Sequence, residues 1–216
     1  MMHTKPFVTA GIPVEKAKKV LIMLHGRGSD AANILELAND FPVTDFAFIA
    51  PQATNHSWYP YSFLAPPIQN EPWLSSAISM LNNVVRDLNL LGITSNHLYF
   101  MGFSQGACLA LEYTARNAVK YGGIVAFTGG LIGDKIETEN YKGDFLGTPV
   151  FIGTSDPDPH VPVERVNASA EIMENMHAVV TKKIYKNMGH TINEDEIKMA
   201  YQLLLSPIAK YTTPLI

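Results

Sequence analysis

Short apolar runs alternate along the chain with longer segments in which apolar residues recur at helical spacing. The first run, VLIMLH at residues 20–25, is continuously apolar, as in a strand that is covered on both faces. The same patterns predict further strands over residues 46–51, 97–102, 123–127, 149–153 and 179–185, and helices over residues 29–41, 71–91, 105–118, 163–177 and 193–205. Regular strand–helix alternation predicts an α/β fold, with a doubly wound, mostly parallel sheet and helices on both faces.

Functional loops of such a sheet lie at the carboxyl ends of its strands. The loops that follow residues 25, 51, 103, 153 and 185 should therefore meet on one side of the molecule. Candidate chemistry is expected in these loops.

Composition and charge indicate the number of domains and exclude some classes of partner. The 216 residues are 47% hydrophobic and 17% charged, without repeats or a linker, which predicts one domain over residues 1–216. A net charge of -4 argues against a nucleic-acid partner. We expect no membrane span, because no run of 18 apolar residues occurs, and the N-terminus lacks the apolar core of a signal peptide. With one cysteine, and hence no internal disulfide, a cytoplasmic location is expected.

The segment QATNHSWYPYSFLAPPIQN, residues 52–70, is long for a loop within a compact domain, and such loops are usually functional. It is rich in proline and aromatic residues. If it folds over the site, Trp58, Tyr59 and Phe63 would line a substrate pocket for an acyl or aryl group. The alternative, that the loop packs its aromatic residues against one another as a satellite cluster, stays open.

The segment GFSQG, residues 102–106, fits the pattern G-x-S-x-G between a predicted strand and a predicted helix. In this arrangement the serine occupies a strained, tight turn that exposes its hydroxyl, and the flanking glycines let strand and helix approach closely. Ser104 is therefore a candidate nucleophile. The alternative is a serine that only caps the following helix.

A serine hydroxyl needs a base that takes its proton. In this architecture the base is a histidine that comes late in the chain, after the serine and an acidic residue. His190 lies between the last predicted strand and the last predicted helix, as this order requires. His25, which precedes the first glycine turn, is expected to make a structural hydrogen bond instead.

The acidic residue should follow the strand at residues 149–153, where the sequence is TSDPDPHVP. Asp156 and Asp158 are both candidates, since one carboxylate fixes the tautomer of the histidine and stabilises its charged form. The other would cap the next helix or brace the loop. Together with His160 the two could suggest a metal site, but the loop offers no further ligands, so we expect a braced turn and no metal.

Acyl transfer also requires hydrogen-bond donors for the oxyanion. The segment LHGRGSD, residues 24–30, has glycines on both sides of Arg27 that allow its backbone to turn inward. The expected donors are the backbone N–H groups of Arg27 and of Gln105. A plain turn with an exposed arginine is the alternative, but the agreement among four strand-end loops favours the functional interpretation.

Taken together, LHGRGSD, APQA…SWY, NEPWLSSAI, GFSQGACLAL, the Val-Pro after the acidic loop, and MGHTI resemble one known family over about residues 18–206. This is the phospholipase/carboxylesterase branch of the α/β-hydrolases, which includes the acyl-protein thioesterases. The resemblance implies Ser104 as nucleophile, His190 as base, and Arg27 and Gln105 as backbone donors. For the acid, the family's spacing counted from Gly153 gives Asp156, whereas the spacing counted back from Val161-Pro162 gives Asp158. Asp158 is favoured, in a loop two residues longer than usual.

The resemblance implies a serine hydrolase that cleaves carboxylic esters or thioesters of short to medium acyl chains through an acyl-enzyme, without a cofactor. Its partner would be a small-molecule substrate, and the sequence leaves a homodimer open. One alternative is an α/β-hydrolase scaffold that binds a ligand without catalysis. Another, suggested by the SWYP…FLAP…NEP loop, is a hydrolase that acts on products of aromatic degradation.

Overall fold

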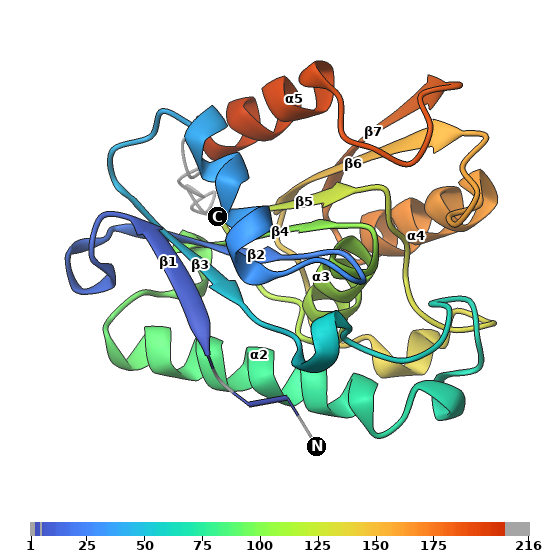
Figure 1. The fold of residues 1–216 in the computed structure, drawn as a ribbon, viewed down its shortest axis with the longest axis horizontal. Helices are drawn as coiled ribbons and strands as arrows, with labels where there is room; N and C mark the ends of the chain where they lie inside the picture. Colours follow the sequence, from blue (N-terminus) through green and yellow to red (C-terminus); the bar gives the residue numbers. More distant parts are fainter. Residues whose placement is uncertain (1–2, 5, 206–216) are drawn as a thin grey trace, which may run out of the picture.

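The computed structural model describes residues 3–4 and 6–205 and contains a seven-stranded sheet (Figure 1). The strand order is β1-β3-β2-β4-β5-β6-β7. The strands are β1 (Phe7–Gly11), β2 (Lys19–Leu24), β3 (Phe46–Pro51), β4 (Leu98–Phe103), β5 (Gly123–Phe127), β6 (Pro149–Asp156) and β7 (Val179–Lys186). All neighbouring strands pair in parallel except β1, which is antiparallel to β3.

Helices cover both faces of this sheet (Figure 1). They are α1 (Ala31–Leu35), α2 (Trp73–Leu90), α3 (Gln105–Arg116), α4 (Val163–Asn175) and α5 (Glu194–Leu205). One apolar core forms between the sheet and α2, α3 and α4, and a second forms between the opposite face and α1 and α5. The central strands are buried on both faces, and this accounts for their continuous apolar sequence.

The predicted fold class is confirmed, and every predicted strand and helix is present with ends that differ by a few residues. The helix predicted over residues 29–41 is divided, because α1 ends at Leu35 and a 3-10 helix continues over Glu36–Asp40. Asp30 caps α1 by accepting a hydrogen bond from the N–H of Asn33.

Strand β1 was not predicted from the sequence. It lies at one edge of the sheet, most of its residues are exposed, and its side chains do not form a buried apolar run. Its register is set by antiparallel pairing with β3. An edge strand of this kind leaves only a weak hydrophobic signal.

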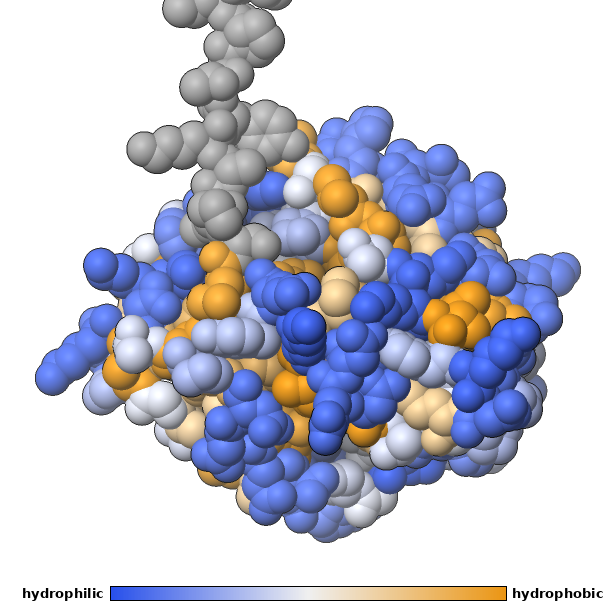
Figure 2. All heavy atoms as spheres, turned by 90° about the horizontal axis from the view of Figure 1, so that it is seen from above, coloured by the Kyte–Doolittle hydropathy of each residue, from blue (hydrophilic) through white to orange (hydrophobic). Residues whose placement is uncertain are grey.

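Most of the face in Figure 2 is hydrophilic, and its apolar residues are scattered among polar ones. Across residues 3–4 and 6–205, no helix combines the length and apolar character needed to cross a bilayer.

Candidate active site

Ser104 occupies a tight turn between β4 and α3. Its backbone has φ 54° and ψ −118°, a conformation that non-glycine residues rarely adopt and that is typical of functional turns. A Cβ on Gly102 would overlap the backbone of Gly106, and a Cβ on Gly106 would overlap the carbonyl oxygen of Leu24. The two glycines therefore allow β2, β4 and α3 to meet closely around Ser104.

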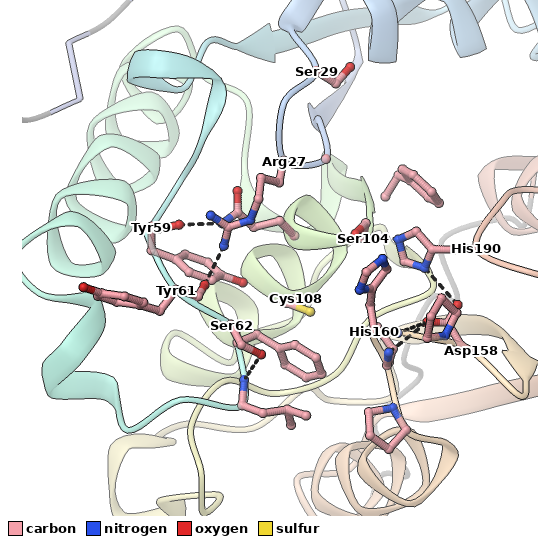
Figure 3. Close-up of a pocket in the computed structure, with 18 of the residues that line it drawn as sticks. Arg27, Ser29, Tyr59, Tyr61, Ser62, Ser104, Cys108, Asp158, His160 and His190 are labelled. Atoms are coloured by element: carbon pink, nitrogen blue, oxygen red, sulfur yellow. Dashed lines mark hydrogen bonds and ion pairs between the residues drawn. The ribbon is translucent and has the colours of Figure 1, made fainter.

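The side chain of Ser104 does not cap α3. Instead, its Oγ lies 2.8 Å from Nε2 of His190. His190 is carried by the loop after β7, and its Nδ1 lies 2.8 Å from Oδ2 of Asp158, on the loop after β6. Three strand-end loops thus place a hydroxyl, an imidazole and a carboxylate in one hydrogen-bonded series (Figure 3).

Asp158 is well suited to hold a negative charge beside His190. Its side chain is fully buried, while that of His190 is 19% exposed. Burial by itself would raise the pKa of Asp158, but the backbone N–H of His160, the ring of His190 and the backbone N–H of Val161 bind the carboxylate and bring the pKa below its usual value.

Asp156, the other carboxylate that the sequence left open, is exposed at the end of β6. It pairs with Lys186 of β7, and its backbone oxygen accepts the N–H of Asn187. The structure therefore brings Asp158, and not Asp156, to the histidine. Asp156 helps to join the two loops through its backbone.

Two backbone N–H groups belong to residues next to Ser104 in the sequence or in the turn packed against it. They belong to Arg27, in the turn after β2, and to Gln105, the first residue of α3, and neither donates a hydrogen bond to a described residue. Gly26 lies against Phe103 and Ser104, which positions the turn of Arg27 beside the hydroxyl. Both N–H groups are available to an oxygen that develops negative charge.

A cavity of about 860 Å³ opens in front of Ser104. Most of its lining comes from five strand-end loops, after β2, β3, β4, β6 and β7, as the sheet topology predicts, and the rest comes from the end of β4 and from α1 and α3. The residues are Gly26, Arg27, Ser29, Asn33, Tyr59, Pro60, Tyr61, Ser62, Phe63, Leu64, Phe103, Ser104, Gln105, Cys108, Asp158, Pro159, His160, Val161, Pro162 and His190.

The predicted aromatic residues of the loop over residues 52–70 divide between the cavity and the core. Tyr59 and Phe63 line the cavity. Trp58 does not: it is fully buried, with its ring 5.0 Å from the ring of His25 and its Nε1 donating to the carbonyl oxygen of that residue. The structure thus places Trp58 as an anchor of the loop, away from the substrate side.

Side chains beside the site hold this loop in place. The side-chain oxygen of Gln105 accepts the N–H of Trp58, and its amide nitrogen donates to the carbonyl oxygen of Tyr59. His25 is buried, and its Nε2 accepts the N–H of Ala53. Burial lowers the pKa of His25, which favours the neutral ring that this bond requires.

Two side chains that line the cavity, His160 and Phe103, were not predicted as site residues. His160 packs edge-on against His190, with ring centroids 4.8 Å apart, and the ring centroid of Phe103 lies 5.2 Å from that of His190. Phe103 is next to Ser104 in the sequence, and His160 is two positions after Asp158. This proximity to predicted site residues is the sequence signal that could have identified them. Both rings pack against the imidazole, whose two nitrogens are bound by Asp158 and Ser104.

Metal ligation finds no support in the part of the chain that the structure describes. No three His, Cys, Asp or Glu side chains come together there as a group that could hold an ion. Asp158 uses both carboxylate oxygens for protein hydrogen bonds.

The model of one protein family, phospholipase/carboxylesterase, matches residues 6–206. The chain belongs to this family. It is a serine hydrolase of the α/β-hydrolase fold that acts on ester bonds, and the comparisons do not favour a non-catalytic scaffold or a hydrolase of aromatic degradation.

Proteins and structures similar to this chain are thioesterases and carboxylesterases, in line with the family assignment. Acyl-protein thioesterase 1 of Saccharomyces cerevisiae is 27% identical over 207 residues, which cover 86% of this chain and 91% of that protein. The crystal structure of a phospholipase/carboxylesterase from Dyadobacter fermentans is 53% identical, with a TM-score of 0.93, and covers 95% of this chain and 99% of its own. The Bacillus cereus carboxylesterase, at 20% identity and a TM-score of 0.75, shares the fold over 93% of each chain.

Proposed function

We propose that this enzyme hydrolyses carboxylic esters or thioesters through an acyl-enzyme in which Ser104 is the nucleophile, His190 the base and Asp158 the orienting acid. The observation that carries the proposal is the series of two 2.8 Å hydrogen bonds from Ser104 through His190 to Asp158. A base positioned against a hydroxyl, and itself held by a carboxylate, is the arrangement that activates serine.

In the first half-reaction Nε2 of His190 takes the proton of Ser104 as Oγ attacks the carbonyl carbon of the substrate. The carbonyl oxygen becomes negatively charged and accepts the backbone N–H groups of Arg27 and Gln105. Asp158 stabilises the imidazolium that forms. When the tetrahedral intermediate collapses, the bond to the leaving group breaks, and His190 gives its proton to the departing alcohol or thiol.

The second half-reaction uses the same groups on a water molecule. His190 takes a proton from water, the hydroxide attacks the acyl-enzyme, and the bond to Oγ of Ser104 breaks as the proton returns to that oxygen. The product is the free acid. No cofactor takes part in either half-reaction.

The dimensions and lining of the cavity support a short to medium acyl chain. The walls include the apolar side chains of Phe63, Leu64 and Val161, and the buried ring of Tyr59. Thioesters are included because acyl-protein thioesterases are among the relatives that match most of the chain. A cytoplasmic location and a homodimer stay predictions.

The test measures hydrolysis of p-nitrophenyl esters of graded chain length, and of matching thioesters, by the wild type, Ser104→Ala and His190→Ala. A fluorophosphonate probe reports the nucleophile directly. We expect both variants to lose on the order of 10⁴-fold or more in kcat, and the probe to label the wild type but not Ser104→Ala. A wild type that cleaves none of these compounds and takes no label would refute the proposal.

A further inference from the structure

The guanidinium of Arg27 lines the cavity without a carboxylate partner. Its Nη1 donates to Oγ of Ser57 at 3.1 Å and to the carbonyl oxygen of Pro60 at 2.7 Å, and its Nη2 donates to the carbonyl oxygen of Tyr61 at 2.5 Å. These acceptors are all neutral. They fix the orientation of the group and leave its positive charge uncompensated by any described residue.

Three of the five guanidinium N–H groups are used in these bonds. The Nε N–H and one Nη2 N–H make no hydrogen bond to a described residue. Arginine binds carboxylates through pairs of parallel N–H groups, and this mode requires two donors. Arg27 therefore has the charge and the remaining donors for one anionic group.

The rest of the cavity favours the same ligand. Among its lining residues the only carboxylate is Asp158, which is already bound to His190 and to two backbone N–H groups. Ser62 lies on the same wall as Arg27, and its Oγ accepts the N–H of Leu64, which leaves its own hydroxyl proton for an acceptor in the cavity (Figure 3). A negatively charged group at this wall meets donors from two residues, Arg27 and Ser62, and no unpaired acid.

The position of this wall identifies which part of the substrate it faces. In Figure 3 the side chain of Arg27 lies with Tyr59 and Tyr61 across the cavity from His190, His160 and Asp158. The leaving group must depart next to His190, because that residue protonates it. The opposite wall therefore receives the acyl portion.

We infer that Arg27, assisted by Ser62, selects substrates whose acyl chain carries a terminal carboxylate, that is, half-esters or half-thioesters of dicarboxylic acids. The inference rests on the proposed function and names its substrate class. Arg27 then has two separate tasks: its backbone N–H serves the oxyanion, and its guanidinium binds the far end of the acyl chain. If the guanidinium only held the loop in place, the enzyme would show no preference for an anionic over a neutral acyl chain.

The experiment compares kcat/KM for monoethyl glutarate with kcat/KM for its neutral amide analogue, ethyl glutaramate, which has the same shape. Wild type, Arg27→Gln, Arg27→Lys and the control Arg86→Gln, an exposed arginine on α2, are measured with both substrates. We expect the wild type to favour the anion, and Arg27→Gln to reduce the anion-to-amide ratio about tenfold. Arg27→Lys should keep part of the preference, and Arg86→Gln should keep all of it.

Salt gives a second readout that needs no variant. Raising the ionic strength should lower kcat/KM of the wild type for the anion and leave that for the amide nearly constant. A wild type that cleaves both substrates with equal kcat/KM, or a ratio that Arg27→Gln leaves unchanged, would overturn the inference while the proposed function stands. A wild type that cleaves neither of these substrates and none of the p-nitrophenyl esters would overturn both.

Discussion

Oδ2 of Asp158 lies 2.8 Å from Nδ1 of His190, and Oδ1 of the same carboxylate accepts two backbone N–H groups of its own loop. The carboxylate thus binds the histidine and the loop at once. Its position depends on the turn that His160 and Val161 make, so the acid is set by local backbone geometry as much as by the imidazole.

This relationship predicts unequal effects for the two aspartates of the loop. Asp158→Asn should lower kcat by on the order of 10³-fold or more, because an amide no longer stabilises the imidazolium and favours the wrong tautomer. Asp156→Asn should change kcat by less than about threefold, since its side chain is exposed and does not contact the histidine. Steady-state kinetics of both variants decide the matter, and a larger loss in Asp156→Asn would assign the acid to that residue.

The side chain of Gln105 should affect substrate binding more than the chemical step. Gln105→Ala leaves the N–H of Trp58 without its acceptor and frees the loop at Tyr59, so we expect KM to rise about tenfold and the free energy of unfolding to fall by about 1–3 kcal/mol. The backbone N–H at this position is retained, so kcat should change less than KM.

Gln105→Glu is the companion variant, because it keeps an acceptor for Trp58 but loses the donor to Tyr59 and Ser57. A rise in KM is expected here too, since a buried carboxylate would face the carbonyl oxygen of Tyr59. A collapse of kcat at constant KM in Gln105→Ala would show instead that the side chain acts in the reaction.

Glu196 predicts a pH dependence of stability. Its side chain is fully buried in α5, with Oε2 accepting the N–H of Asn193 and Oε1 without a partner among the described residues. Burial raises its pKa to about 7, from a model-compound value of 4.5. The unfolded chain therefore releases this proton at lower pH than the folded one. The stabilisation from this group is complete below about pH 4.5 and is lost as the pH rises to about 7.

Glu196→Gln, which cannot ionise, should lack this loss. Relative to the wild type, its free energy of unfolding should therefore increase by up to about 3 kcal/mol between pH 4.5 and pH 8, so that the variant becomes the relatively more stable protein. Urea unfolding at several pH values measures it, with Glu194→Gln, an exposed neighbour in the same helical turn, as the control. Parallel pH profiles for wild type and Glu196→Gln would mean that Glu196 is ionised at no unusual cost.

The parts of the site that could be predicted from the sequence are those fixed by topology. Ser104 and His190 follow β4 and β7, and parallel strands bring their carboxyl ends to the same edge whatever the loops do. The structure places their side chains 2.8 Å apart, while their catalytic roles stay predictions. Asp158 could be favoured over Asp156 by spacing, but the choice depends on the turn at residues 158–161, which spacing does not describe.

Features that depend on side-chain direction could not be predicted in this way. Trp58 and Tyr59 are adjacent in the loop and both are buried in the apolar core, yet only Tyr59 also lines the cavity. The guanidinium of Arg27 reaches residues 57–61, about 30 positions further along the chain. Contacts at this separation leave no periodic pattern, and strand β1 at the exposed edge leaves little hydrophobic pattern either.

Arg27 and Gln105 share one feature: each has its backbone beside Ser104 and its side chain bound to residues 57–61. A shift of that loop would therefore displace the two backbone amides that lie beside the hydroxyl of Ser104. Insertions or deletions at residues 57–61 would alter the reaction geometry together with the choice of substrate. Ser62–Leu64 lie just beyond the residues that Arg27 and Gln105 bind. Substitutions there can reshape the cavity while the two amides stay in place, so this short segment is where substrate specificity can change with the least effect on the reaction geometry.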